Sequence, residues 1–115
     1  MNTRFQTLTY WAYMLASRRY GTLYVGVTNS LNRRIWQHRE GEMGGFTKRY
    51  GVQRLVWFRG FGEVTDAITL EKRLKRWRRE WKIQLIEEEN PLWVDLYELL
   101  IAEPAPRDPV FLGPG

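Results

Sequence analysis

The chain of 115 residues contains no cysteine and a single histidine. The absence of cysteine excludes disulfide bonds, thiolate metal sites and cysteine nucleophiles together. The sequence also has no apolar run of the roughly 18 residues that a membrane-spanning helix needs. Its first nine residues lack the charged-then-apolar order of a signal peptide. We therefore expect a cytoplasmic protein that does not associate with membranes.

Aromatic residues are abundant, with six Trp, six Tyr and five Phe. Because each large ring buries much apolar surface, a chain of this length can form one compact domain around one core. We place this domain at residues 1–102. Residues 103–115 are rich in proline and are expected to form a mobile tail.

Basic and acidic residues are distributed unevenly. Residues 1–82 hold 17 Lys and Arg against 6 Asp and Glu, whereas residues 83–115 hold 1 against 7. A strongly basic segment favours a polyanionic partner such as nucleic acid. Charge alone fits an ordinary solvated surface with an acidic tail equally well, so a candidate site is needed beside it.

Two strands joined by a hairpin are predicted near the N-terminus. Residues 8–15 are mostly aromatic and apolar, and residues 22–27 alternate between two faces. The short polar segment between them ends in glycine, as hairpin connections often do. With Arg18 and Arg19 at the tip, Tyr13 would lie directly opposite Tyr24, and both phenols would share one face.

A helix is predicted after the hairpin. Ser30 is expected to cap its N-terminus, and the helix should end near Gly41. Arg34 and His38 are four residues apart, which places both side chains on one helical face. Residues 41–51 are rich in glycine and are expected to form a loop.

A third strand and further helical segments complete the prediction. Residues 53–59 should form a central strand, because residues 55–58 are all apolar. Thr65 is expected to cap a helix with a core-facing apolar stripe, which continues or restarts as far as Glu89. Asn90-Pro91 should stop it. A last short helix is expected over residues 95–102.

The order of these residues resembles the GIY-YIG nuclease domain, and most closely the small single-domain proteins of that family. The motifs that carry the likeness are Tyr13, then Tyr24-Val25-Gly26, then Asn32-Arg33-Arg34 through His38, then Glu71 to Lys75, then Asn90-Pro91. The chain departs from the first family motif, where Trp11-Ala12 replace glycine and isoleucine before Tyr13, and it has Val25 in the second. Both tyrosines are present.

The resemblance implies an α+β fold, with a small three-stranded antiparallel sheet flanked by helices. It also implies cleavage of a DNA phosphodiester bond with one divalent metal ion, Mg²⁺ or Mn²⁺. Such cleavage needs a base that activates water, positive charge near the phosphorane, and a Lewis acid or proton donor at the leaving oxygen.

The resemblance also implies a role for each site residue. Glu71 would bind the metal, since one carboxylate with waters and substrate oxygens is a normal Mg²⁺ site. Tyr24 would act as a general base or orient the water, and Arg34 would hold the scissile phosphate and lower the pKa of the phenol. Tyr13 would support the site. His38 would take part in proton transfer or hold the water network of the metal.

Further residues are expected to contact DNA, mainly through its phosphates. They are Arg33, Lys48, Arg49, Lys75, Arg76, Arg78, Arg79 and Asn90. Taken singly, the site candidates have ordinary structural explanations as well. A strand tyrosine usually packs in a core, a single histidine on a basic helix is more often a surface residue, and a glutamate four residues before a lysine usually forms an ion pair. The joint pattern favours a site.

We therefore predict a metal-dependent DNA endonuclease of low intrinsic sequence specificity, acting on single-stranded, branched or damaged DNA, in repair or recombination. One alternative is a non-catalytic nucleic-acid-binding module, which would use residues 72–82 and exposed aromatics such as Trp36 or Trp77. Another is a partner-dependent nuclease subunit, with an exposed apolar patch near Trp93, Leu96 and Leu100. The sequence identifies no protein partner and no oligomeric state.

Overall fold

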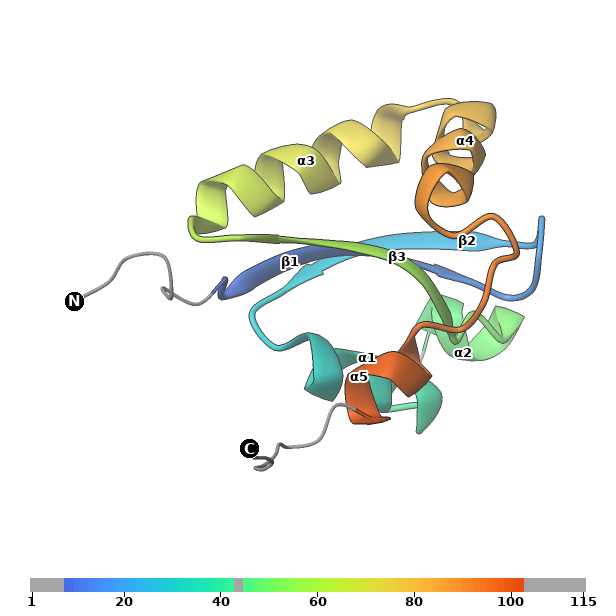
Figure 1. Cartoon of the computed structure of the whole chain (residues 1–115). Coiled ribbons are helices and arrows are strands. Elements are labelled where there is room, and N and C mark those ends of the chain that lie inside the picture. The colour runs from blue at the N-terminus through green and yellow to red at the C-terminus, as the bar shows by residue number, and fades with distance from the viewer. Residues whose placement is uncertain (1–7, 43–44, 103–115) are drawn as a thin grey trace, which may run out of the picture.

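The computed structural model describes residues 8–42 and 45–102, and three antiparallel strands form its central sheet (Figure 1). The strands are β1 (Tyr10–Ala16), β2 (Leu23–Thr28) and β3 (Arg54–Phe61), in the order β2-β1-β3. This confirms the α+β class and the three-stranded antiparallel sheet. The proline-rich tail predicted for residues 103–115 lies outside the described residues.

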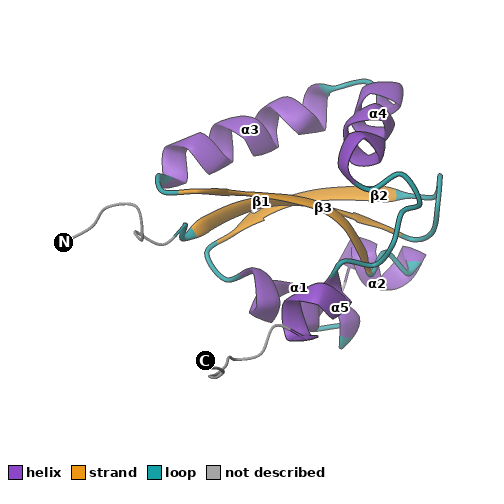
Figure 2. Ribbon diagram, in the orientation of Figure 1, coloured by secondary structure: helices purple, strands orange, loops and turns teal. Residues whose placement is uncertain are grey.

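In the described part of the chain, five helices cover the two faces of the sheet (Figure 2). On one face lie α3 (Val64–Arg76) and α4 (Arg79–Glu89). On the other lie α1 (Leu31–Arg39), α2 (Gly45–Tyr50) and α5 (Tyr97–Ala102). None of these helices has the length and apolar character needed to cross a membrane.

The side chains of β1 divide the core into two clusters, one on each face of the sheet. Ala12, Met14 and Ala16 contribute to the cluster under α3 and α4, whereas Tyr13 and Leu15 contribute to the cluster against α1. Strand geometry requires this alternation. Because β1 is the central strand, all five of these residues are fully buried.

β3 is an edge strand, although its apolar run predicts a central one. A bulge opposite β1 brings the consecutive residues Val56 and Trp57 into the same cluster. Its outer edge is covered by the segment between α4 and α5. The Leu96 N–H donates to the Leu55 carbonyl, and the Leu55 N–H donates to Asp95 Oδ1. An edge strand covered on its faces and its edge has the composition of a central strand.

The register of the β1–β2 hairpin differs from the predicted one. Tyr13 pairs with Gly26, and Tyr24 pairs with Leu15. The predicted pairing of the two tyrosines is therefore wrong by two residues. A shift by two residues preserves the face to which each side chain points, so the two phenols still share one face.

The cause of the shift is the length of the turn. The Ser17 N–H donates to the Thr22 carbonyl, which leaves residues 18–21 as the loop. A two-residue turn at Arg18 and Arg19 would need positive φ angles, which arginine disfavours. In the longer loop, the left-handed conformation falls on Tyr20 instead, at φ 60°.

Helix boundaries agree with the predictions only in part. Ser30 occupies the N-cap position of α1 as expected, although its side chain makes no capping hydrogen bond. The N-cap of α3 is Glu63 and not Thr65. Residues 41–51, predicted as a loop, contain α2, which is followed by Gly51 in the left-handed conformation at φ 63°.

Asn90 fastens the end of α4 to the sheet. Its Nδ2 group donates to the carbonyls of Val56 at 3.1 Å and Val94 at 2.9 Å, and its Oδ1 accepts from the Val94 N–H at 2.9 Å. The side chain is buried. This geometry gives Asn90 a structural role, because its polar atoms are already engaged with the backbone, and the DNA contact expected of it stays a prediction.

Replacing Asn90 by alanine should therefore destabilise the fold. Asn90→Ala leaves buried backbone groups of β3 and the following segment unpaired, which should lower the free energy of unfolding by about 2–3 kcal/mol. Urea titration measures the change. The matched control is Asn32→Ala, at an exposed position on α1, which should change stability by less than about 0.5 kcal/mol. Equal stability of the two variants would contradict this role.

Candidate active site

Tyr13 lies across the position of Gly26 on the neighbouring strand. A Cβ atom added to Gly26 would lie 2.5 Å from both Cζ and the hydroxyl oxygen of Tyr13. No side chain larger than hydrogen fits there unless the buried ring moves. The glycine of the second motif therefore has a physical role, which is to let the Tyr13 phenol pass over β2.

The Tyr13 hydroxyl ends in a buried chain of polar side chains. Its oxygen lies 3.1 Å from Nε2 of His38, and Nδ1 of His38 lies 3.2 Å from Oγ1 of Thr47. His38 is only 1% exposed, and Thr47 is buried as well. The alternative that His38 is a surface residue is thus contradicted. The chain of contacts joins β1, α1 and α2.

Burial keeps both ring systems of this chain uncharged at neutral pH. Burial raises the pKa of Tyr13 well above its ordinary value of 10, Tyr24 raises it further, and the Arg34 guanidinium opposes the rise. Burial, with a smaller contribution from Arg34, lowers the pKa of His38 to about 4. Tyr13 therefore keeps its proton, and His38 remains neutral.

Tyr24 and Arg34 lie beside this pair. The Tyr24 ring is 5.2 Å from the His38 ring and 6.3 Å from the Tyr13 ring, centroid to centroid. Both side chains are half-buried, so they retain contact with solvent. Arg34 also lines a small polar hollow of about 90 Å³. The structure thus brings together the four residues predicted to be catalytic.

Glu71 lies on the other side of the sheet. It shares the buried face of α3 with Ala67 and Leu74, and α3 packs on β1 and β2. The carboxylate is 9% exposed, and it pairs with Lys75. In the described residues, no hydrogen bond or ion pair joins Glu71 to the tyrosine cluster. The two parts of the predicted site therefore lie on opposite faces of the sheet.

The donor set around Glu71 limits how a metal could be held. Among the described residues, no three His, Cys, Asp or Glu side chains are grouped so that they could hold one metal ion. A cation at Glu71 would therefore take one protein carboxylate and complete its shell with oxygens of water or phosphate. Mg²⁺ accepts such a shell, since it usually keeps several waters.

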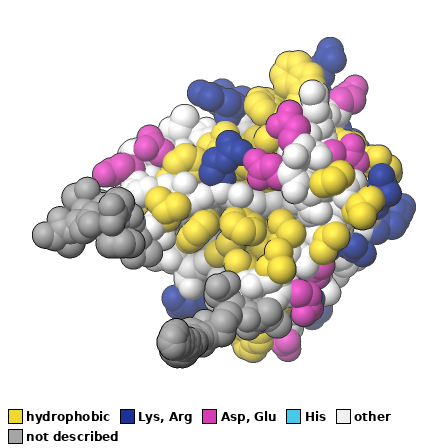
Figure 3. Space-filling view, in the orientation of Figure 1, with side chains coloured by type: hydrophobic (Ala, Val, Ile, Leu, Met, Phe, Trp, Pro, Cys, Tyr) yellow, Lys and Arg dark blue, Asp and Glu magenta, His cyan; other side chains and the backbone are white. Residues whose placement is uncertain are grey.

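The predicted DNA-binding residues form two surfaces. Arg33, on α1, and Lys48 and Arg49, on α2, are exposed on the face that carries the tyrosine cluster. A second basic surface covers α3 and α4, where Figure 3 shows Lys and Arg side chains at the top of the view. It contains Lys75, Arg76 and Arg78. The two surfaces lie on opposite faces of the sheet.

Arg79 is engaged within the protein. Its Nη2 donates to the carbonyls of Tyr20 and Gly21, each at 2.7 Å. It therefore holds the β1–β2 turn against α4. Because the guanidinium already has these partners, Arg79 has a structural role. The DNA contact expected of Arg79 stays a prediction.

Two residues near the site were missed from the sequence, Thr47 and Phe46. Thr47 holds the His38 imidazole, and the Phe46 ring lies 6.4 Å from the Tyr24 ring. Both belong to α2, which was not predicted because residues 41–51 are rich in glycine. The available signal was the four-residue spacing of Phe46 and Tyr50 between Gly45 and Gly51, which is a helical spacing.

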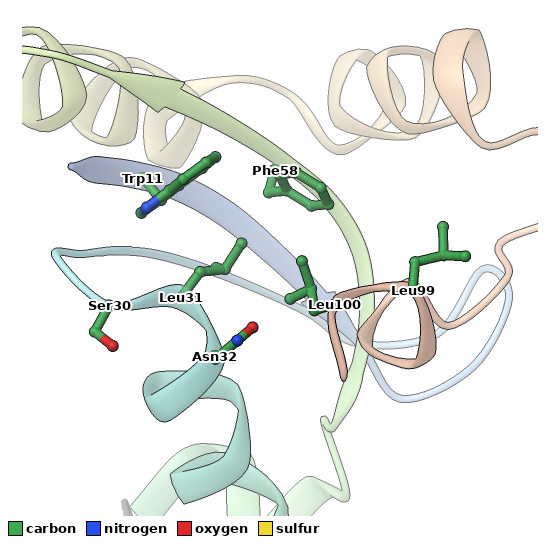
Figure 4. A pocket seen from close by; sticks show the side chains of 7 residues that line it. All are labelled: Trp11, Ser30, Leu31, Asn32, Phe58, Leu99 and Leu100. Carbon is green, nitrogen blue, oxygen red and sulfur yellow. The ribbon is translucent and has the colours of Figure 1, made fainter. Parts of the chain in front are cut away.

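An apolar hollow that no residue of the tyrosine cluster lines is shown in Figure 4. This apolar groove of about 470 Å³ is lined by Trp11, Leu31, Phe58, Leu99 and Leu100, with Ser30 and Asn32. Trp11, which departs from the family motif, packs edge-on against Phe58 with their centroids 5.9 Å apart.

The groove overlaps in part with the exposed apolar patch that was predicted near Trp93, Leu96 and Leu100. Leu100 lines the groove, but Trp93 is fully buried, so an exposed patch at Trp93 is excluded.

Comparison with known proteins places these features in a family. The family model of the GIY-YIG catalytic domain matches residues 9–84. A UPF0213 protein of Aeromonas salmonicida is 32% identical over 85 residues, which are 74% of this chain and 62% of that protein. The match thus spans about three fifths of the length of that relative.

Other relatives carry the same family name. A UPF0213 protein of Haloquadratum walsbyi is 36% identical over 67 residues, 58% of this chain and 75% of that protein. The solution NMR structure of a UPF0213 protein from Bacillus halodurans has 28% sequence identity and a TM-score of 0.49. That comparison covers 78% of this chain and 95% of that one.

The contact between Tyr13 and Gly26 predicts a steric effect. Gly26→Ala places a methyl group against the Tyr13 ring, which should cost about 1–3 kcal/mol of unfolding free energy. It should also displace the phenol from His38. The matched control is Gly62→Ala, where a Cβ meets nothing within 4 Å. Urea titration and the imidazole NMR signals of His38 measure both effects. A Gly26→Ala variant as stable as Gly62→Ala would contradict the geometry.

The pKa of His38 predicts a pH dependence of stability. The unfolded chain binds a proton at His38 below the ordinary value of 6.5, whereas the folded chain stays neutral until about 4. Stability supported by the neutral imidazole is therefore complete above pH 6.5. It should fall as the pH drops below that value, by up to about 1.4 kcal/mol per pH unit.

His38 is the only histidine, so the effect can be assigned. Urea titrations between pH 5 and 7.5 should show the slope in the native chain, and the slope should disappear in His38→Gln. The imidazole NMR signals of the folded protein should remain those of the neutral ring throughout this range. An imidazole that titrates near its ordinary pKa would refute the assignment.

Proposed function

The chain belongs to the GIY-YIG family, a superfamily of nucleases, and from this premise we propose that it is a metal-dependent DNA endonuclease. The observation that carries the proposal is the gathering of Tyr13, Tyr24, Arg34 and His38 on one face of the sheet. Arg34 is a permanent cation, Tyr13 and Tyr24 are phenols, and His38 is a neutral imidazole. Together they can hold a phosphate and orient a nucleophile.

Arg34 is the proposed phosphate-binding residue. Its guanidinium is permanently charged, and two of its donors can hold two phosphate oxygens at once. It is half-buried and lines the polar hollow beside the cluster. Charge that develops on the phosphorane would meet a cation that is already in place, which lowers the barrier without reorganisation.

Tyr24 is the phenol placed to act on the nucleophile. It is half-buried, whereas Tyr13 is fully buried, and burial holds Tyr13 in its protonated form. Tyr13 is therefore a donor and not a base. We assign its proton to the bond with Nε2 of His38, so that His38 and Thr47 position Tyr13. Tyr24 then remains to orient or deprotonate the attacking water.

Glu71 is the proposed metal ligand. When bound there, Mg²⁺ or Mn²⁺ would stabilise negative charge on phosphate oxygens as a Lewis acid. Lys75, which pairs with the carboxylate in the structure, compensates its charge. Because Glu71 and the tyrosine cluster lie on opposite faces of the sheet, a phosphate shared by both would have to lie at an edge of the sheet.

The exposed cations support low sequence specificity. Arg33, Lys48 and Arg49 stand on the face of the tyrosine cluster, and such groups bind phosphates without reading base edges. Single-stranded, branched or damaged DNA are the proposed substrates. A role in repair or recombination follows from that choice and is part of the proposal.

The second surface favours one alternative, a nucleic-acid-binding module. Trp77 borders two neighbouring hollows, of which one is lined by Lys72, Arg73 and Arg76 and the other by Trp81. A cationic hollow beside an aromatic one suits a phosphate and a base. Such a module would bind nucleic acid there and would not require the tyrosine cluster.

Cleavage of a panel of labelled DNAs tests the proposal. Single-stranded, duplex, flap and junction DNAs are incubated with Mg²⁺ or Mn²⁺. The native chain should cut at least one of them. Glu71→Gln and Tyr24→Phe should each lower kcat by about 100-fold or more, because each removes a group that acts in the transition state.

Glu80→Gln is the control, because Glu80 is an exposed carboxylate on α4. It should retain full activity. Binding of the panel without cleavage under either metal would refute the nuclease and favour the binding module. Full activity of Glu71→Gln would refute the metal assignment.

A further inference from the structure

The helix α2 contributes almost nothing to the core. Of its six residues, only Thr47 is buried, and that residue bonds to His38. Its two aromatic residues remain on the surface, with Phe46 48% and Tyr50 50% exposed. Aromatic rings that are half exposed contribute little to the stability of the fold. Core packing therefore does not explain the position of Phe46 and Tyr50.

These rings continue the aromatic cluster of the candidate site. The centroids of Tyr24 and Phe46 are 6.4 Å apart, with the ring planes 30° apart. Those of Phe46 and Tyr50 are 4.9 Å apart. His38, Tyr24, Phe46 and Tyr50 thus form an uninterrupted row of rings, which begins in the buried part of the site and ends at the surface.

Cations accompany the exposed end of the row. Lys48 and Arg49 lie on the same short helix and are both exposed. The Arg49 guanidinium is 5.7 Å from the centre of the Tyr50 ring. Exposed rings beside cations are the arrangement by which proteins hold single strands, since the rings stack on bases and the cations hold phosphates. Duplex DNA offers no unstacked base to such rings.

We propose that Phe46 and Tyr50 form a stacking platform for unpaired bases of single-stranded DNA, next to the phosphate held by Arg34. The platform would select substrates with an unpaired segment beside the cleaved bond. This selection rests on the proposed nuclease function, whereas binding to the platform does not. Binding and cleavage are therefore tested separately.

Binding is measured in EDTA, so that no cleavage occurs. The probes are a fluorescein-labelled oligothymidylate of about 12 nucleotides and a blunt duplex of the same length. Phe46→Leu keeps an apolar side chain but removes the ring. It should weaken binding of the single strand by roughly 5- to 100-fold, and binding of the duplex by less than about 2-fold. Tyr50→Leu should behave likewise, and Tyr50→Phe, which keeps the ring, should bind like the native chain.

Tyr20→Leu is the matched control, since Tyr20 is 52% exposed and the Arg19 guanidinium is 5.2 Å from its ring centre. It should leave binding of the single strand unchanged. Unchanged imidazole NMR signals of His38 would show that the α2 variants remain folded. The platform is refuted if Phe46→Leu binds the single strand as tightly as the native chain does, or if Phe46→Leu weakens both probes equally. If the platform binds but no DNA is cut, the nuclease proposal fails and the binding site stands.

Discussion

The hydroxyl of Tyr13 is the polar group on which the arrangement of the site depends. Tyr13 lies on the central strand and is fully buried, so water cannot satisfy its hydroxyl. Gly26 gives the ring a path across β2, His38 supplies the hydrogen-bond partner, and Thr47 holds the imidazole. One chain of contacts thus fixes two strands and two helices relative to each other. The residues next to these anchors, Tyr24 on β2 and Arg34 on α1, are positioned as a consequence.

The same burial determines which residues carry charge. With Tyr13 protonated and His38 neutral, positive charge in the cluster comes from Arg34, and the Glu71 carboxylate lies on the opposite face of the sheet. Uncharged anchors can be buried at modest cost, whereas a buried charge would need a partner. In the tyrosine cluster, the fold therefore places neutral groups inside and leaves the half-buried positions to Tyr24 and Arg34, whereas the buried Glu71 on the other face is paired with Lys75.

Local periodicity accounts for what could be predicted from the sequence. The two-residue period of a strand and the four-residue spacing of a helix put Tyr13 with Tyr24 and Arg34 with His38 on shared faces, and both relations hold in the structure. The predicted register of the hairpin was wrong, because the local sequence does not indicate that Ser17 and Thr22 close the loop. The order of the strands, and the face on which α3 places Glu71, depend on tertiary packing that no local pattern encodes. The roles of Asn90 and Arg79 depend on contacts with distant backbone, for the same reason.

The position of the basic surfaces constrains the substrate independently of the tyrosine cluster. One surface, on α1 and α2, and the other, on α3 and α4, lie on opposite faces of a single sheet. A straight duplex is stiff over the length of a small protein and can follow only one of them. A flexible strand can pass from one face to the other around β2, which is an edge strand of the sheet. The division of charge and the exposed rings of α2 thus favour the same kind of substrate, one with an unpaired segment.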